Sequence, residues 1–161
     1  MSPSMLGALD DCLQRQIVAG ERLIETLRAE TEALRSGAAA DIEAALAPKQ
    51  DALGAFTALD TEREQVLAAS GWSAERETPA EWIERQDHPD RDTVLARWQR
   101  LLAIAEDCGR RNLINGALIQ AGLRHSRQLL DLLSGRPPEE TTSSYGPAPT
   151  RAAAGHSLGK A

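Results

Sequence analysis

The sequence predicts an all-α protein, an antiparallel helical hairpin or bundle with a long C-terminal helix and a disordered tail. The composition is the first reason: Ala, Leu, Arg and Glu dominate, while Val, Ile, Phe and Tyr are scarce, which favours helices over sheets. The second reason is that apolar residues recur at spacings of three and four, as on the buried face of a helix. A chain of 161 residues has room for one domain with a modest core.

The domain organisation follows from a change in composition after Gly135. Residues 136–161 are rich in Pro, Gly, Ser, Thr and Ala, and they contain few large apolar side chains. Such a segment buries too little surface to offset the loss of chain entropy on folding. We therefore predict a helical domain over residues 1–135 and a flexible tail over residues 136–161.

The first helix is predicted from about Pro3 to Arg35, because its Leu and Ile residues share one face. These residues are Leu6, Leu9, Leu13, Ile17, Ile24, Leu27 and Leu34. Ser36-Gly37 should end the helix, since glycine readily adopts the left-handed conformation of a C-terminal cap. A second helix should begin near Asp41, a plausible N-cap, and run to about Ala69. We expect Pro48 to kink or restart it. The short connection makes the two helices an antiparallel hairpin.

A short third helix is predicted after Thr78, in the sequence Thr-Pro-Ala-Glu. The threonine suits the N-cap, the proline suits the first helical position, and Glu81 completes a capping box. This helix should hold Trp82 and Ile83 and stop near Asp87-His88-Pro89.

The last helix is predicted from about Asp90 to Leu133, ahead of Gly135. A seven-residue repeat gives it an apolar seam: Trp98, Leu101, Ala105, Cys108, Asn112, Asn115, Ile119, Gly122, Ser126, Leu129 and Leu133. Asn112, Asn115 and Gly116 interrupt the centre of this seam. A buried asparagine costs roughly 1–3 kcal/mol unless it finds hydrogen-bond partners, so we expect the pair to specify helix packing rather than chemistry.

Several classes of function are disfavoured. A net charge of −6 argues against a nucleic-acid surface, and no apolar stretch is long enough to insert directly into a membrane. The N-terminus lacks the layout of a signal peptide, and the arginines, spread among acids, are interpreted as solvated. Cys12 and Cys108 form no CxxC motif and are expected to be reduced core residues of a cytoplasmic protein. No convergent constellation of catalytic, metal-ligating or cofactor-binding residues is apparent, which predicts a protein that is not an enzyme.

The remaining candidate is a protein-binding surface. Leu129, Leu130, Leu132 and Leu133 spread over an arc of roughly 160°, counted at 100° per residue, which is wider than one neighbouring helix covers. Either two neighbours cover the arc in a compact bundle, or part of it binds an amphipathic helix of another protein. Tyr145 in the tail also has two interpretations: it is incidental, or it anchors a short docking motif.

The segment Cys108-Gly-Arg-Arg-Asn112-Leu-Ile-Asn115-Gly116-Ala-Leu118-Ile119 resembles the core signature of the FlgN family of flagellar type III export chaperones. The family carries Asn-x-x-Asn-Gly in a long last helix, then a leucine-rich stretch, then a tail tyrosine followed by glycine. Here these elements correspond to Asn112, Asn115 and Gly116, to residues 129–133, and to Tyr145-Gly146. The chain departs from the family pattern at Pro147 and Pro149, which stiffen the segment after the tyrosine.

The resemblance implies a cytoplasmic chaperone that binds the C-terminal amphipathic segments of hook–filament junction proteins and escorts them to the export gate. The client would lie on Leu123, Leu129, Leu130 and Leu133. Tyr145 and Gly146 would dock on the cytoplasmic domain of the gate's large membrane component. The resemblance implies no nucleotide, metal or other cofactor.

Two other readings of the sequence stay open. A structural coiled coil could self-associate through the apolar seam of the last helix, and its tail would then be dispensable. A helical regulatory protein, such as an anti-sigma-like binder of a transcription factor, would use the same surface for a different partner. The sequence also leaves open whether the free protein is a monomer or a homodimer.

Overall fold

The computed structural model describes residues 5–135 as four helices: α1 (Met5–Ser36), α2 (Ala39–Ala69), α3 (Pro79–Glu84) and α4 (Arg91–Leu133). No strand occurs in these residues, and the predicted all-α fold with a long last helix is confirmed. Two units can be separated in the chain, Met1–Ser126 and Arg127–Ala161, and α4 contributes to both. Residues 1–4 and the predicted tail, 136–161, lie outside the described residues.

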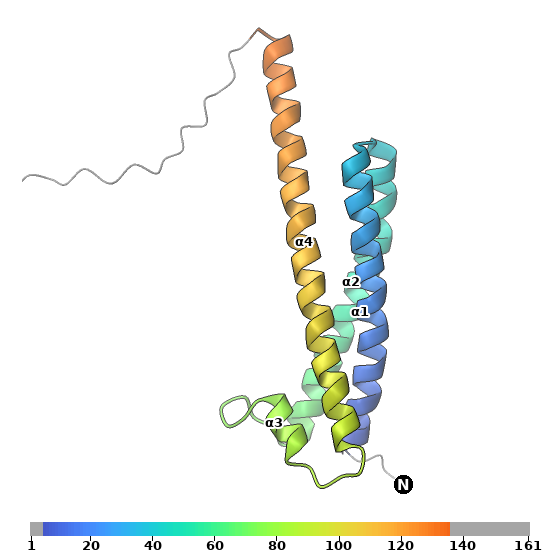
Figure 1. Cartoon of the computed structure of the whole chain (residues 1–161), viewed down its shortest axis with the longest axis vertical. Helices are drawn as coiled ribbons and strands as arrows, with labels where there is room; N and C mark the ends of the chain where they lie inside the picture. The colour runs from blue at the N-terminus through green and yellow to red at the C-terminus, as the bar shows by residue number, and fades with distance from the viewer. Residues whose placement is uncertain (1–4, 136–161) are drawn as a thin grey trace, which may run out of the picture. The chain divides into compact units, whose positions relative to one another are not determined.

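Helices α1 and α2 form the predicted antiparallel hairpin (Figure 1). Gly37 supplies the turn with a φ of 70°, and its N–H donates to the carbonyl of Ala33 at 3.2 Å. Ion pairs then mark the register: Arg15 pairs with Glu62 and Glu30 with Lys49, so residue numbers rise along one helix as they fall along the other.

The start of α2 and its passage through Pro48 differ from expectation. The N-cap is Ala38, which makes no side-chain cap, and Asp41 lies in the first turn, where its charge still favours the helix dipole. The helix continues through Pro48 without a restart. We attribute this to packing just beyond the proline, where Lys49 pairs with α1 and Ala52 is buried.

The capping box that was predicted for α3 is confirmed. The hydroxyl of Thr78 accepts a hydrogen bond from the N–H of Glu81 at 3.3 Å, and the Glu81 carboxylate accepts one from the N–H of Thr78 at 2.7 Å. The helix ends at Glu84, somewhat before the predicted stop. Both Trp82 and Ile83 are buried, so this short helix closes one end of the core.

In the first unit, helix α4 runs beside α1 and parallel to it (Figure 1). Arg97 pairs with Asp10 and Arg100 with Glu21, and further along both helices Asn115 bonds to Glu30. The side chains that α4 buries form a narrow stripe: Val94, Trp98, Leu101, Ile104, Cys108 and Asn115. In the first unit the structure therefore has a hairpin with a third helix packed on it.

The phase of this buried stripe corrects the predicted seam of α4. Ala105 and Asn112 are exposed, whereas Ile104 is buried. Residues seven apart are offset by about 20° around a straight α-helix. Along α4 this offset accumulates, so one of the two positions in each seven-residue repeat rotates away from the hairpin. Ile119, Gly122 and Ser126 are exposed as well.

The three helices approach one another closely at Gly20 of α1. A Cβ atom placed there would lie 2.5 Å from Cγ2 of Ile104 and 3.0 Å from Cε2 of Phe56. The sulfur of Cys108 lies 3.8 Å from the Gly20 carbonyl oxygen at the same level. The glycine, which costs helix propensity when judged from sequence, thus provides the space into which α2 and α4 pack.

Both cysteines are buried and unbonded to each other, as predicted for core residues. Burial raises the pKa of each thiol, Cys12 and Cys108, which keeps both protonated and unreactive near neutral pH. Within residues 5–135, no helix combines the length and the apolar character needed to cross a membrane.

Candidate functional site

The centre of the site is a buried polar network around Asn115 that ties α4 to the hairpin. The Asn115 amide donates to the Leu27 carbonyl at 3.0 Å and to the Glu30 carboxylate at 2.6 Å, while its oxygen accepts from the Thr31 hydroxyl at 2.6 Å. Lys49 of α2 lies 2.9 Å from the same carboxylate. All polar atoms of the Asn115 side chain are thus satisfied, and the network links three helices.

Asn115 has the interhelical hydrogen bonds expected of a residue that specifies packing, and Asn112 differs from it. Asn112 is exposed and lines an apolar groove of ≈ 210 Å³, together with Leu53 and Phe56 of α2. A Cβ at Gly116 would meet open space, so close packing does not explain that glycine. Within the described residues, Asn115 and not Asn112 hydrogen-bonds to the α1 backbone, so of the two asparagines it is Asn115 that holds the register of α4.

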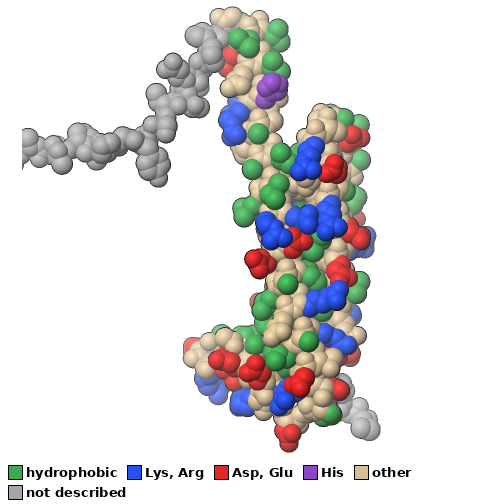
Figure 2. Space-filling model, viewed as in Figure 1, with side chains coloured by type: hydrophobic (Ala, Val, Ile, Leu, Met, Phe, Trp, Pro, Cys, Tyr) green, Lys and Arg blue, Asp and Glu red, His purple; other side chains and the backbone are tan. Residues whose placement is uncertain are grey.

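Beyond Asn115, α4 carries exposed apolar side chains. Every residue from Ile119 to Ser126, the end of the first unit, is exposed. Ile119 and Leu123 expose 40% and 47% of their surface, large fractions for aliphatic side chains. Figure 2 shows apolar side chains at the surface of α4. The predicted site residue Leu123 is therefore accessible to another molecule.

The other predicted apolar site residues lie in the second unit, where residues 127–135 are described. Leu129, Leu130 and Leu133 are 47%, 64% and 85% exposed, and their neighbour Leu132 is 67% exposed. The leucines thus lie at the surface of the helix, as the second unit is described by itself.

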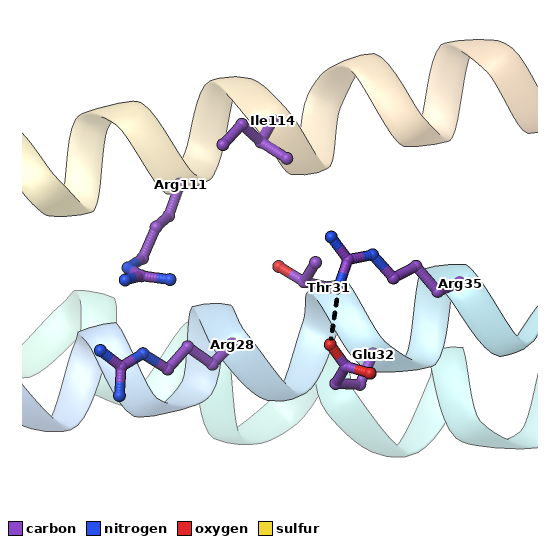
Figure 3. Close-up of a pocket in the computed structure, with 6 residues that line it drawn as sticks. All are labelled: Arg28, Thr31, Glu32, Arg35, Arg111 and Ile114. Atoms are coloured by element: carbon purple, nitrogen blue, oxygen red, sulfur yellow. Dashed lines mark hydrogen bonds and ion pairs between the residues drawn. The ribbon is translucent and has the colours of Figure 1, made fainter.

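A pocket lies between α1 and α4 (Figure 3), and the sequence did not predict it. Its lining residues are Arg28, Thr31, Glu32, Arg35, Arg111 and Ile114. Figure 3 shows Arg111 extending from α4 toward α1, where Arg28 lies. The arginines had been interpreted as scattered among acids, but the fold brings three of them together from two helices. Their separation in sequence hid this cluster.

The acids near this pocket are already paired. Glu32 bonds to Arg35 at 3.0 Å, and Asp107 bonds to Arg111 at 3.0 Å and to Arg110 at 2.5 Å. The hydrogen bond from Arg111 is the main cause that holds the pKa of Asp107 below its ordinary value. Arg28 has no hydrogen-bond or ion-pair partner within residues 5–135. One guanidinium of the pocket is consequently free to bind another anion.

The predicted docking residues Tyr145 and Gly146 lie outside the described residues. Within the described part of the chain, no three His, Cys, Asp or Glu side chains gather in a group that could hold a metal ion.

The fold and the exposed face of α4 define a class: a helical-hairpin protein with an exposed apolar helix surface. The sequence model of the FlgN protein family matches residues 5–151. The chain therefore belongs to the FlgN family, as its Asn-x-x-Asn-Gly segment had predicted. No curated protein and no solved structure matches the chain.

Membership of this family implies a flagellar export chaperone, whose partners are flagellar proteins. The family is one of chaperones and is not known for enzymatic activity. The match extends past the described residues and includes the positions of Tyr145 and Gly146.

Proposed function

We propose that the protein is a cytoplasmic chaperone for hook–filament junction proteins, which binds their C-terminal amphipathic segments and escorts them to the type III export gate. The client would bind on α4, at Leu123, Leu129, Leu130 and Leu133. The observation that carries the proposal is the exposure of these leucines on a helix of a chaperone-family protein. An amphipathic segment laid on such a face is a common mode of recognition.

The energetics suit a chaperone that must release its client. A segment that is disordered when free loses roughly 2–5 kcal/mol of the gross interaction when it orders on binding. Covering a leucine contributes about 1.5–3 kcal/mol, and less where the side chain is already partly covered. A few half-exposed leucines therefore supply a net affinity that is moderate. Moderate affinity permits transfer to the export gate without nucleotide or metal.

The tail is proposed to dock on the gate. Tyr145, followed by Gly146, would contact the cytoplasmic domain of the gate's large membrane component. A tyrosine in a short motif offers a large contact area at a small entropic cost. The family match across this position supports the assignment.

Replacing Leu129 or Leu133 by aspartate is expected to abolish client binding, because a charge would be buried without a partner. The far-UV circular dichroism should stay unchanged, since both side chains are exposed. Leu102→Asp is the matched control: Leu102 is also on α4 and 52% exposed, it lies several turns before the proposed client site, and a count of 100° per residue places it on the side of the helix opposite Leu129. A loss of helicity in the Leu129 variant would show that the leucines are core residues.

The measurement is size-exclusion chromatography with light scattering, on the protein alone and mixed with the junction proteins of its own organism. A complex of defined mass, lost in Leu129→Asp and kept in Leu102→Asp, is the expected result. A stable homo-oligomer that binds no junction protein would favour the self-associating coiled coil. Binding of a transcription factor in place of a junction protein would favour the regulatory reading.

Tyr145→Ala is expected to leave client affinity unchanged and to weaken binding of the chaperone–client complex to the purified cytoplasmic domain of the gate. Both affinities can be measured by isothermal titration calorimetry. Tyr145→Phe is the control, since it keeps the aromatic contact area and removes only the hydroxyl. Equal gate affinity for the wild type and Tyr145→Ala would end the docking assignment while leaving the client site intact.

A further inference from the structure

One stretch of α4 is positively charged, although the chain as a whole is negatively charged, and this stretch also carries exposed apolar residues. Between Asp107 and Asp131 the sequence contains Arg110, Arg111, Arg124 and Arg127 and no acidic residue, in a chain of net charge −6. Such local excess of one sign selects partners of the other sign and steers their approach. The exposed part of α4 is thus both apolar and basic.

The pocket between α1 and α4 gives this charge a defined place. Arg28 has no partner among residues 5–135, Arg111 faces it from α4, and Ile114, which is 47% exposed, supplies an apolar wall. The pocket is also supported from behind, because the Thr31 hydroxyl in its lining is bonded to the buried Asn115. A guanidinium binds a carboxylate with two parallel hydrogen bonds, which makes arginine the usual residue for this task.

We propose that this pocket binds an acidic side chain of the client, so that the segment recognised by the chaperone is acidic as well as amphipathic. An aspartate or glutamate of the client enters beside Arg28 and Arg111, and an apolar residue of the same segment packs on Ile114. This inference rests on the proposed client binding along α4, and it adds the chemistry of the client. Repulsion between two chains of net charge −6 disfavours a second copy of the chain as the occupant.

The test is the affinity of synthetic peptides that cover the C-terminal segments of the junction proteins, measured by fluorescence anisotropy with the full chain. Arg28→Gln should weaken binding by about fivefold, the effect of losing one largely exposed ion pair. Arg22→Gln is the matched control, because Arg22 is an exposed arginine of α1 that also lacks a partner in residues 5–135 but does not line the pocket. It should bind as the wild type does.

Two further measurements make the test specific. Raising NaCl from about 50 mM to about 300 mM should weaken the wild type several-fold and Arg28→Gln less, because screening acts on the pair that the variant lacks. Arg28→Glu should lose binding, and a peptide whose acidic residue is changed to lysine should restore it. Thermal melts of each variant by circular dichroism check that the fold is unchanged.

The failures of the two proposals are distinguishable. Wild-type binding with equal affinities for Arg28→Gln and Arg22→Gln, and with no dependence on salt, would overturn the acidic-client inference alone. No binding by the wild type would overturn the proposed function and this inference with it. Light scattering also compares the mass of free Arg28→Gln with that of the free wild type. A difference in mass without a difference in peptide affinity would assign the pocket to self-association and overturn the inference.

Discussion

Replacing Asn115 by leucine is expected to lower the free energy of unfolding by about 3 kcal/mol. The change removes three hydrogen bonds at once, to the Leu27 carbonyl, the Glu30 carboxylate and the Thr31 hydroxyl. Glu30, which is 4% exposed, would keep only Lys49 as a partner. A buried carboxylate with too few partners is among the costliest defects in a core, whereas the added apolar surface gains little at this crowded position.

The matched control is Asn112→Leu, one turn away on the same helix. Asn112 is exposed and no hydrogen bond ties it to the hairpin within the described residues, so the change should stay within about 0.5 kcal/mol. Urea denaturation followed by circular dichroism measures both variants. Equal destabilisation by the two substitutions would mean that Asn115 has no special role.

A double-mutant cycle isolates the network itself. Glu30→Gln in the Asn115→Leu background should recover part of the lost stability, because a neutral amide costs less than a carboxylate when its partner is removed. The coupling between the two sites should then be on the order of 1 kcal/mol or more. Additive effects would show that Asn115 contributes to stability through packing and not through its bond to Glu30.

Gly20→Val is expected to lower the free energy of unfolding by about 3 kcal/mol, the upper range for overpacking a well-filled core. Its Cβ would meet Ile104 at 2.5 Å and Phe56 at 3.0 Å, and Ile104 is branched at the atom that carries the contacting methyl group, so it has little freedom to move. Either α4 shifts away from the hairpin or α1 distorts. Thermal and urea unfolding measure the loss.

Gly54→Val provides the control for helix propensity. Gly54 is also inside a helix, and a Cβ there would meet nothing within 4 Å. Because valine has a slightly better helix propensity than glycine, the stability of Gly54→Val should be unchanged or slightly higher.

Ile104→Ala combined with Gly20→Val should restore much of the stability that Gly20→Val loses, because it makes room for the added side chain. A Gly20→Val protein as stable as Gly54→Val would contradict the packing described at this crossing.

Much of the fold could be predicted from local patterns. Apolar spacing located the four helices, and cap chemistry located several of their ends, as the capping box at Thr78 and the turn at Gly37 show. The face of α1 was correct at Leu6, Leu9 and Leu13, which are all buried. These features depend on residues within a few positions of one another, so one sequence contains them in full.

The candidate site could be predicted only in part. The exposed leucines Leu123, Leu129, Leu130 and Leu133 were selected from a helical pattern and a family resemblance, and the structure places them at the surface of α4. Their role in binding stays a prediction. Sequence reasoning treated Asn112 and Asn115 as equivalent, and it missed the pocket around Arg28 and Arg111, because both depend on which face of α4 turns toward α1.

By itself the sequence determined that this protein is helical, where each helix lies, and, through its Asn-x-x-Asn-Gly segment, which family it belongs to. Only the tertiary structure decided that Asn115 is buried on Glu30 while Asn112 faces out, that Gly20 admits α4, and that three arginines line one pocket. Asn115 and Glu30 are 85 residues apart, and their contact is set by the rotation of one helix on another. That rotation is fixed by the packing of many side chains together, and no local pattern contains it.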